Sequence, residues 1–294
     1  MPPIALVTTA QARPRDDDLP PLLAALHAIG IAASPCDWDD PAIDWSAYDA
    51  AILRCPWDYT QRLPEFLAFI DRVSAQTRLF NPPEVVRANT DKHYLGALAE
   101  LGLSVVPSLF LEPGDRAETL LAWLPDQGDC VVKPCVGAGS QDALRFGPSA
   151  RSAAVGHAQR LLSSQRAVLV QPYLDRVDDL GETALIFIDG QFSHAIRKGP
   201  LLQRDTVAGP AMFAPERIQA RGPGEDELAL AHAVLASLPG PPLLYARVDL
   251  LRQADGAPCV LELELTEPSL FFAQGPGSVE RMAAAIRGRV NAAR

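Results

Sequence analysis

Two short stretches near the end of the sequence carry charged residues at every second position. They read Arg247-x-Asp249 and Glu262-x-Glu264, and the positions between and beside the charges are apolar, namely Val248, Leu250, Leu261, Leu263 and Leu265. Side chains alternate between the two faces of a β-strand, so each stretch presents its charges on one face only. If the two strands pair, three carboxylates and one guanidinium gather on the same face.

This cluster of acidic residues predicts a metal site. Carboxylates that lie close together repel one another unless a cation neutralises them or water screens them. Magnesium takes oxygen ligands, often one or two carboxylates together with substrate phosphates. We therefore predict that Asp249, Glu262 and Glu264 bind magnesium, with Glu262 bridging two ions. The alternative is a solvated polar face, which would more often mix Lys and Thr with Glu. Arg247 either braces a carboxylate or binds a migrating phosphoryl group.

A lysine followed by a glycine-rich loop ends an apolar stretch in the middle of the chain. The stretch is Val131-Val132-Lys133-Pro134, and the loop from Cys135 to Ser140 contains Gly137 and Gly139. Small residues let backbone amides approach phosphate oxygens, and the lysine adds a positive charge beside them. We predict a phosphate-binding loop of Lys133, Gly137, Gly139 and Ser140. It matches neither a Walker motif nor a dinucleotide fingerprint, and a glycine-rich hairpin connection is the alternative.

Two further segments are candidates for nucleotide contacts. Lys92 stands at the start of an expected helix, where a lysine is more usually solvated. An apolar strand runs from Val168 into Gln171, Pro172, Tyr173 and Leu174, and the proline forces an extended backbone whose free amide and carbonyl groups can bind an adenine edge. Asp178 and Glu182 follow in an acidic turn that could accept a ribose hydroxyl. Ordinary loop chemistry explains each of these segments equally well.

The acidic composition limits the classes of partner. Asp and Glu outnumber Lys and Arg by 36 to 26, which gives a formal net charge of -10. No run of basic residues forms a stripe that could follow a phosphate backbone, so we expect no nucleic-acid partner. A bound nucleotide must then be held by a local cluster of cations and metal, because the overall field repels it.

Length, amino terminus and cysteines narrow the class of protein. A chain of 294 residues with 48% hydrophobic content can form two or three lobes. The short apolar run at the amino terminus has no basic leader, so we expect neither a signal peptide nor a membrane span, and a cytoplasmic location. Five cysteines without a C-x-x-C pair argue against a disulfide framework and a zinc site, and we interpret them as buried thiols.

The elements that must position these groups begin with alternating strands and helices. We expect strands over 4–7 and 50–54 and helices over 22–29 and 64–73. Parallel strands joined by crossover helices place ligand-binding loops at their carboxyl ends. The residues expected there, facing a cleft, are Thr8, Thr9, Arg54, Trp57 and Tyr59. For the two aromatic residues, simply covering the end of a strand is at least as good an explanation.

A break at Asn81-Pro82-Pro83 separates this unit from the rest of the chain, because proline lacks an amide donor. Beyond it we expect helices over 90–101, 117–124, 152–162 and 226–238 and from Ser278, and strands over 105–111, 130–133, 142–146 and 168–171. Two hairpins are expected, 183–188 with 191–197 around Asp189-Gly190 and 244–251 with 258–265 around Asp255-Gly256. The segment 199–221 is rich in Pro, Gly and charge, which favours a mobile loop that acts as a lid.

Taken in order, these motifs resemble the ATP-grasp superfamily, especially its glutathione synthetase-like, RimK-like and D-alanine–D-alanine ligase-like members. The motifs are Lys92, Lys133 with its glycine loop, 171–174, Arg247-x-Asp249 and Glu262-x-Glu264. The resemblance covers the chain from about Asn81 to its end. It implies an α/β fold with a Rossmann-like lobe over 1–82 and two ATP-grasp lobes, 83–170 and 171–294, that clamp the nucleotide.

The same resemblance implies the cofactors. ATP would be held by the two lysines at its phosphates and by the linker strand at its adenine, with one or two magnesium ions, or manganese in their place, on the late acidic residues. Glu264 stands where the family usually has Asn, which keeps an oxygen ligand but adds negative charge and leaves the number of ions open.

A narrower resemblance is to the cyclo-ligases of cycloserine biosynthesis, which close O-ureido-serine into a ring. It rests on 56–59, 181–183, 193–199 and the Leu-Glu-Leu-Glu-Leu run. It implies an ADP-forming carbon–nitrogen ligase of antibiotic biosynthesis that activates a small amino-acid-like carboxylate as an acyl phosphate for attack by nitrogen. The residues expected to steady the acyl phosphate are Arg247, Arg197 and Lys198.

Other functions stay open at this point. A ligase that joins two amino acids or peptides would share the same motifs, and so would a small-molecule kinase that leaves the phosphate on a hydroxyl. A module that binds nucleotide without turnover is the third alternative. The expected partner is a small-molecule substrate, and the sequence is compatible with a homodimer.

Overall fold

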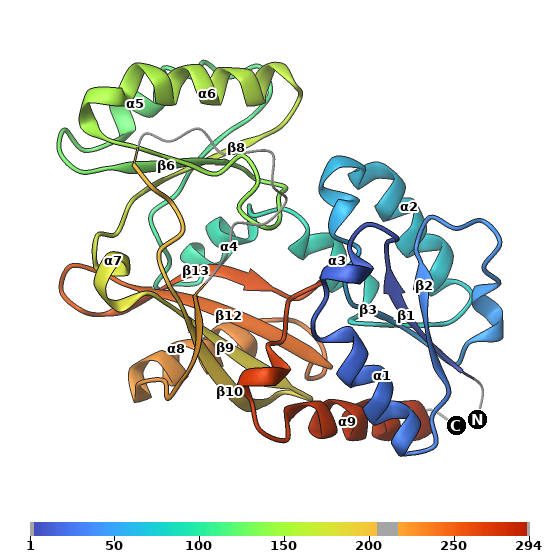
Figure 1. Cartoon of the computed structure of the whole chain (residues 1–294). Helices are drawn as coiled ribbons and strands as arrows, with labels where there is room; N and C mark the ends of the chain where they lie inside the picture. The colour runs from blue at the N-terminus through green and yellow to red at the C-terminus, as the bar shows by residue number, and fades with distance from the viewer. Residues whose placement is uncertain (1–2, 205–216, 293–294) are drawn as a thin grey trace.

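The computed structural model describes residues 3–204 and 217–292. These residues form three β-sheets with helices packed against them (Figure 1). The sheets take their strands from residues 4–80, 109–172 and 182–264. This mixed α/β architecture agrees with the fold class expected from the sequence. The lobe boundaries at residues 82 and 170 remain our proposal.

The first sheet is parallel and carries helices on both faces. Its strands, in the order β2-β1-β3-β4, are β1 (Ile4–Thr8), β2 (Ala33–Asp37), β3 (Ala50–Leu53) and β4 (Arg78–Phe80). Helix α1 (Leu19–Ala28) packs on one face and α2 (Leu63–Ser74) on the other. Every residue of β1 is buried, which is why this strand reads as a continuous apolar run. Strands β2 and β4 were not expected, because Ser34-Pro35 and a length of three residues give weak strand signals.

The second sheet is antiparallel and lies under two helices in the upper part of Figure 1. Its strands, in the order β5-β8-β6-β7, are β5 (Leu109–Leu111), β6 (Cys130–Pro134), β7 (Leu144–Phe146) and β8 (Val168–Pro172). The helices are α5 (Thr119–Trp123) and α6 (Arg151–Ser163). Val132 and Val170 pack toward these helices, whereas their neighbours Lys133 and Gln171 face a cavity on the other side. The alternation along each strand thus separates core from site.

The third sheet contains both expected hairpins. Its strands, all antiparallel in the order β11-β10-β9-β12-β13, are β9 (Glu182–Ile188), β10 (Gln191–Lys198), β11 (Ile218–Arg221), β12 (Tyr245–Arg252) and β13 (Pro258–Glu264). Asp189 and Gly190 form the first turn with φ of 52° and 74°, as the prediction of positive φ requires. Gly256, in the second turn, has φ of 92°.

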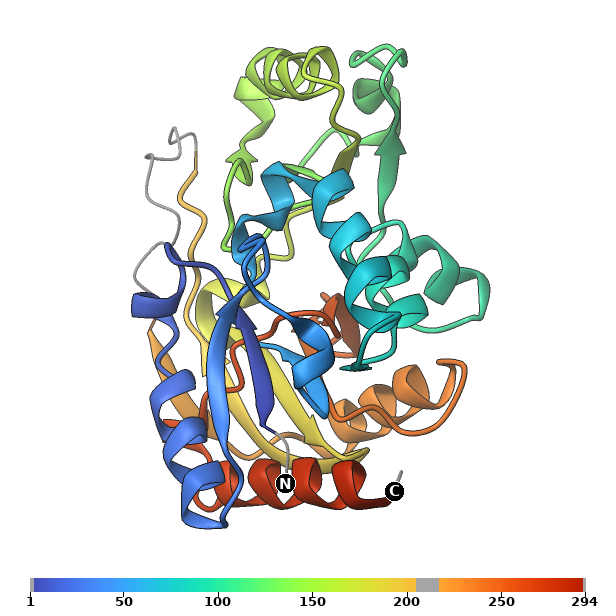
Figure 2. The ribbon, with the colours of Figure 1, turned by 90° about the vertical axis from the view of Figure 1, so that its right-hand side faces the viewer.

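The two faces of this sheet have different partners. Leu185, Phe187 and Val248 pack with α4 (Tyr94–Glu100) and α8 (Glu225–Ala236). On the opposite face, Ile186 and Ile188 pack against α9 (Ser278–Ala292), which shares a core with α1 and the first sheet. Figure 2 shows α9 running beneath the sheet beside α1. The apolar end of this face is covered in this way, and its other end carries the charged residues.

The structure corrects several expected boundaries. Helix α3 (Pro83–Asn89) begins within the expected break, because proline needs no amide hydrogen bond in a first helical turn. The helix expected over 90–101 is α4, and the strand expected over 105–111 is reduced to β5. Residues 218–221 form β11 instead of continuing a loop, and α7 (Arg176–Leu180) was not anticipated. The centre of the expected lid, residues 205–216, lies outside the described residues.

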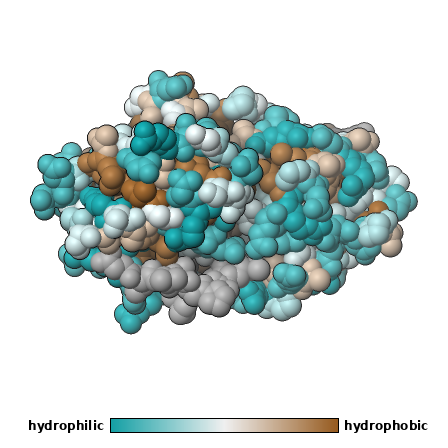
Figure 3. All heavy atoms as spheres, turned by 90° about the horizontal axis from the view of Figure 1, so that it is seen from above, coloured by the Kyte–Doolittle hydropathy of each residue, from teal (hydrophilic) through white to brown (hydrophobic). Residues whose placement is uncertain are grey.

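Short 3-10 turns complete the described elements. They are Arg13–Arg15, Trp45–Ala47, Trp57–Gln61, Pro148–Ala150 and Phe272–Gln274. The face seen from above in Figure 3 is largely hydrophilic, with apolar residues in separate patches. Among the described helices, none combines the length and the apolar character that crossing a membrane requires. All five cysteines are buried free thiols, as interpreted from the sequence.

Candidate active site

A cavity of about 660 Å³ is lined by residues of the second and third sheets and by loops, including the turn that follows β3 of the first sheet. The first lobe contributes Trp57 and Tyr59, the second sheet Val131, Lys133 and Gln171, and the third sheet Glu182, Lys198, Arg247, Glu262 and Glu264. Most residues predicted from the sequence to bind ATP or metal therefore meet at one place.

Strand pairing places the late charged residues opposite one another. Arg247 faces Glu264 across the β12–β13 ladder, and Asp249 faces Glu262. Arg247 Nε donates to Asp249 Oδ1 at 2.8 Å, and its Nη2 bonds both Asp249 Oδ2, also at 2.8 Å, and Glu264. Of the two roles left open for Arg247, bracing carboxylates is the one that this geometry displays.

Lys198 extends the cluster to the neighbouring hairpin. Its Nζ lies 2.7 Å from Asp249 Oδ2 and 2.5 Å from Glu182 Oε1. Asp249 is only 1% exposed and lies beneath the cavity surface, where Arg247 and Lys198 hold its pKa below the usual range despite its burial. Lys198 and Arg247 thus line the cavity and also pair with the carboxylate of Asp249 beneath its surface.

The remaining two lysines, Lys92 and Lys133, lie near Glu262. Lys92 Nζ lies 2.7 Å from Glu262 Oε1 and donates to the carbonyl oxygen of Gly137 at 2.8 Å, which ties the lysine to the glycine loop. Burial lowers the pKa of Lys133 below its usual value, even though Glu262 opposes the shift. The whole sequence has three lysines, and all three line this cavity.

The negative charge around the cavity is large enough to attract a divalent cation. Burial raises the pKa of Glu264 to about 7 and that of Glu182 to about 8, although Arg247 and Lys198 attract their negative charges. The protein's own cations therefore do not fully compensate the buried carboxylates. Oxygen donors concentrated in this way suit Mg²⁺, so the residues present fit the ion expected from the sequence.

The linker strand reaches the cavity with its predicted residues. Gln171, Pro172, Tyr173 and Leu174 all line it, as do Gly137, Gly139 and Ser140 of the glycine loop. The ring of Tyr173 is covered by Arg145, whose guanidinium carbon lies 3.4 Å from the ring centre. These contacts hold the linker in place beside the cavity.

Besides Asp249, which lies beneath the cavity surface, two predicted site residues do not line the cavity. Asp178 bonds the Tyr173 hydroxyl and pairs with Arg145 at 3.5 Å, and it is not among the residues that line the cavity. Arg197 donates to the carbonyl oxygens of Leu180 at 2.6 Å and Asp179 at 2.8 Å, also outside the cavity. Because neighbouring residues of a strand point to opposite faces, Lys198 can face the cavity only if Arg197 faces away.

The first lobe contributes only part of its expected set. Trp57 and Tyr59 line the cavity, which goes beyond covering the end of a strand. Thr8 and Thr9 are buried without reaching it, and Thr8 Oγ1 donates to Asp37 at 2.9 Å. Arg54 is 0% exposed and forms ion pairs with Asp16 and Asp18 at 3.3 and 3.6 Å. Its role is therefore structural.

Sequence reasoning missed several residues around the cavity. Glu267, Ser269 and Phe271 come from the loop after β13 and line its wall. Asn89 donates to the carbonyl oxygen of Leu263 at 2.7 Å and accepts from the amide of Leu265 at 2.7 Å, so its side chain continues the pairing of β13. Glu267 could have been predicted from the sequence, because it is an acidic residue that lies just past the charged strand and before Pro268. No local signal marks Asn89.

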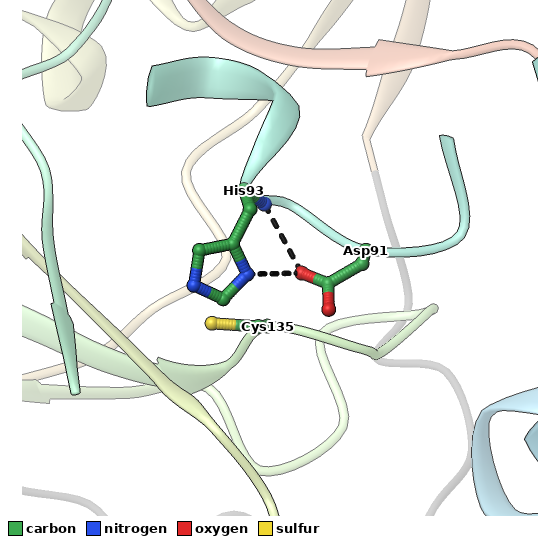
Figure 4. Close-up of side chains that lie close together, drawn as sticks. All are labelled: Asp91, His93 and Cys135. Atoms are coloured by element: carbon green, nitrogen blue, oxygen red, sulfur yellow. Dashed lines mark hydrogen bonds and ion pairs between the residues drawn. The ribbon is translucent and has the colours of Figure 1, made fainter. Parts of the chain in front are cut away.

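A second group of potential metal ligands lies beside Lys92. Figure 4 shows Asp91, His93 and Cys135 close together, with their ligand atoms within 4.8 Å of one another. His93 Nδ1 lies 2.6 Å from Asp91 Oδ1, and its Nε2 lies 2.9 Å from Glu112 Oε1. Because carboxylates engage both ring nitrogens, hydrogen bonding already accounts for this arrangement. The amide of Lys92 donates to the carbonyl of Cys135 at 3.0 Å, so the group helps hold the lysine against the glycine loop.

The chain is similar in sequence and in fold to proteins of known kind. Residues 4–81 match the family described as "D-cycloserine synthetase DcsG, N-terminal domain". The chain is 43% identical over 297 residues to the cycloserine biosynthesis protein DcsG of Streptomyces lavendulae, with 98% of each chain covered. It matches the crystal structure of D-cycloserine synthetase DcsG with a TM-score of 0.90 and 44% identity, over 98% of this chain and 99% of that one. The D-alanine–D-alanine ligase of Bacillus anthracis shares the fold, with a TM-score of 0.72 and 15% identity, over 100% of this chain and 98% of that one.

Proposed function

This chain belongs to the DcsG family of ATP-grasp ligases, and we propose that it uses ATP to close O-ureido-serine into the cycloserine ring. The family relation covers nearly the whole chain, which makes the protein an ATP-dependent ligase. The observation that carries the finer proposal is the cavity in which Arg247, Glu262 and Glu264 face Lys92 and Lys133. This arrangement can hold a nucleotide beside a small carboxylate substrate.

The cavity offers separate contacts for each part of the nucleotide. Lys92, Lys133 and the amides of the 137–140 loop would hold the phosphates, and 171–174 would hold the adenine. Asp249, Glu262 and Glu264 would hold one or two magnesium ions, which supply positive charge for the phosphates. In the present structure Lys92 pairs with Glu262 at 2.7 Å. Nucleotide binding would let this lysine exchange a carboxylate for a phosphate oxygen.

The proposed reaction has two steps. An oxygen of the substrate carboxylate attacks the γ-phosphorus of ATP, the bond to ADP breaks, and an acyl phosphate forms. The oxygen-bound nitrogen of the ureido group then attacks the carbonyl carbon and loses a proton, and inorganic phosphate leaves. Water must also cleave the carbamoyl group from that nitrogen, which releases carbon dioxide and ammonia and leaves cycloserine. The residues act mainly by position and charge, and Lys198 and Arg247 lie where they can stabilise the phosphoryl oxygens. Arg197 has no part in this proposal because it points away from the cavity.

Product analysis tests this proposal directly. With O-ureido-serine as the only organic substrate, we expect ADP and free phosphate to appear in equal amounts together with cycloserine. A ligase that joins two molecules would release ADP only when a second amine is added. A stable phosphorylated product would identify a kinase, and no ADP release across amino-acid substrates would identify a binding module. Any of these three results contradicts ring closure.

The three lysines allow a second prediction from solution chemistry. An amine-reactive ester near pH 8 should modify Lys133 more than about tenfold faster than Lys92 or Lys198. The reason is that burial lowers the pKa of Lys133, whereas nearby carboxylates raise the pKa values of Lys92 and Lys198 despite their burial, and only the neutral amine reacts. Mass spectrometry of peptides measures each rate. ATP with magnesium should slow the modification of Lys133, and preferential labelling of Lys92 would contradict the assignment.

The partners and location follow from the same proposal. The substrate is a small amino-acid-like molecule, and the acidic composition supports the expectation of no nucleic-acid partner. ATP is abundant in the cytoplasm, and a protein that uses it is expected to be located there. A homodimer stays a prediction that measurement of the mass in solution can test.

A further inference from the structure

One buried carboxylate of the cavity has no cation beside it. Glu267 lines the cavity and is 8% exposed. Asp17, which also lines the cavity, is exposed to solvent. The remaining acidic residues at the site have partners: Glu182 and Asp249 pair with Lys198, Glu262 with Lys92, and Glu264 with Arg247. Among the described residues, Glu267 forms no ion pair with Lys, Arg or His. A buried carboxylate in this state is costly, so a positive group supplied by a ligand would stabilise it.

The position of Glu267 is held from the first lobe. The hydroxyl of Tyr59 hydrogen-bonds its carboxylate. Trp57 Nε1 donates to its backbone carbonyl at 3.0 Å, and Arg54 Nη1 donates to the carbonyl of Pro268 at 3.3 Å. A phenol hydrogen bond orients a carboxylate without neutralising it. Burial, followed by repulsion from Glu264, accordingly raises the pKa of Glu267 to about 8.

Glu267 also lies close to the expected site of chemistry. Its charge interacts with those of Glu264, Glu262 and Lys92. In an α-amino acid the ammonium group and the carboxylate are attached to the same carbon. A residue that binds the ammonium group must therefore lie beside the place where the carboxylate is phosphorylated. Glu267 meets this condition, and the aromatic residues Trp57, Tyr59 and Phe271 line the same cavity.

We propose that Glu267, oriented by Tyr59, binds the α-ammonium group of the substrate and makes the enzyme specific for α-amino acids. This inference rests on the proposed function. A metal ligand would be the other use for such a carboxylate. Glu267 is placed differently from the predicted ligands, because it lies three residues beyond the end of β13 and already accepts a hydrogen bond from Tyr59.

The test compares two substrates in two proteins. The substrates are O-ureido-serine and the same molecule with hydrogen in place of the α-amino group, and the proteins are the wild type and Glu267→Gln. A hydrogen bond between charged groups should give the wild type a preference in kcat/KM of about 10- to 100-fold for the amino compound. The variant should lose this preference to within about threefold, mainly through a higher KM for the amino compound. The KM for ATP should change by less than about twofold.

Two further variants separate recognition from damage to the fold. Glu267→Asp keeps the charge and should restore part of the preference that Glu267→Gln loses. Glu280→Gln makes the same chemical change on an exposed side chain at the start of α9 and should leave both substrates unaffected. Melting temperatures of all the proteins show whether each variant is folded.

The possible results separate the two proposals. A preference that survives in Glu267→Gln, or a wild type that does not discriminate, overturns the assignment of Glu267. A changed requirement for Mg²⁺ with an unchanged preference also overturns it, in favour of a metal ligand. Failure of the wild type to release ADP with O-ureido-serine overturns the proposed ring closure instead. Pairs of α-amino acids and their deamino counterparts, compared by the same ADP assay, then decide the role of Glu267.

Discussion

Replacing Glu262 with Gln is expected to lower the rate of ADP release by about 10²- to 10³-fold. Glu262 faces Asp249 across the ladder and lies 2.7 Å from Lys92, between the lysines and the other carboxylates. The amide would keep the shape of the side chain but remove the negative charge that attracts a metal ion. It would also leave Lys92 without its carboxylate partner. Steady-state ADP release at saturating ATP, with magnesium varied, measures the change.

The matched control for this variant lies on the same hairpin. Asp255→Asn makes the same replacement of an oxygen by nitrogen in the exposed turn, where the side chain accepts from the amide of Ala257 at 2.9 Å. It should keep the wild-type rate. The melting temperature of Glu262→Gln should stay within a few degrees of the wild type, since its side chain is 23% exposed and lines a cavity. A near-normal rate in a folded Glu262→Gln protein would refute the metal-site assignment.

Arg54→Met is expected to lower the free energy of unfolding by about 3 to 5 kcal/mol. The side chain of Arg54 is 0% exposed, and its two partners Asp16 and Asp18 are 1% and 7% exposed. Asp18 also accepts from the backbone amides of Leu270, Phe271 and Phe272, at 2.5, 3.1 and 2.9 Å. Without the guanidinium, two buried carboxylates would stay uncompensated between the first lobe and the loop after β13. Urea denaturation measures the loss.

A surface arginine provides the comparison. Arg87 pairs with Asp71, and these side chains are 36% and 70% exposed, so Arg87→Met should cost less than about 1 kcal/mol. Because Arg54 also donates to the carbonyl of Pro268, its replacement should weaken substrate binding in whatever protein remains folded. Equal losses of stability in the two variants would show that the buried network is not a major source of stability.

Local patterns in the sequence were enough to predict much of the candidate site. Alternation of charged and apolar residues predicted that Asp249, Glu262 and Glu264 share a face, and the strand register places Asp249 and Glu262 opposite each other. Asp189-Gly190 predicted a tight hairpin, because its turn needs positive φ. The buried strand ending in Lys133 and its glycine loop was found for similar reasons. Such features depend on residues that are close together in the chain.

Weak or ambiguous local patterns led to the errors. Arg197 and Lys198 are adjacent and chemically alike, and only the pairing of β10 decides which one faces the cavity. Asp178 looked suitable for a ribose, but in the folded chain it bonds Tyr173 and Arg145 instead. Short strands such as β4 carry too few residues for a recognisable period.

By itself, therefore, the sequence determined the types of element, the charged strand face and the resemblance to ATP-grasp ligases. Only the tertiary structure decided which charges pair, which face each strand turns to the cavity, and that Tyr59 meets Glu267. Periodicity and turn chemistry act over a few residues, whereas the bond from Trp57 to the Glu267 carbonyl joins positions 210 residues apart. Contacts at that separation depend on how the three sheets pack, and no short segment encodes that packing.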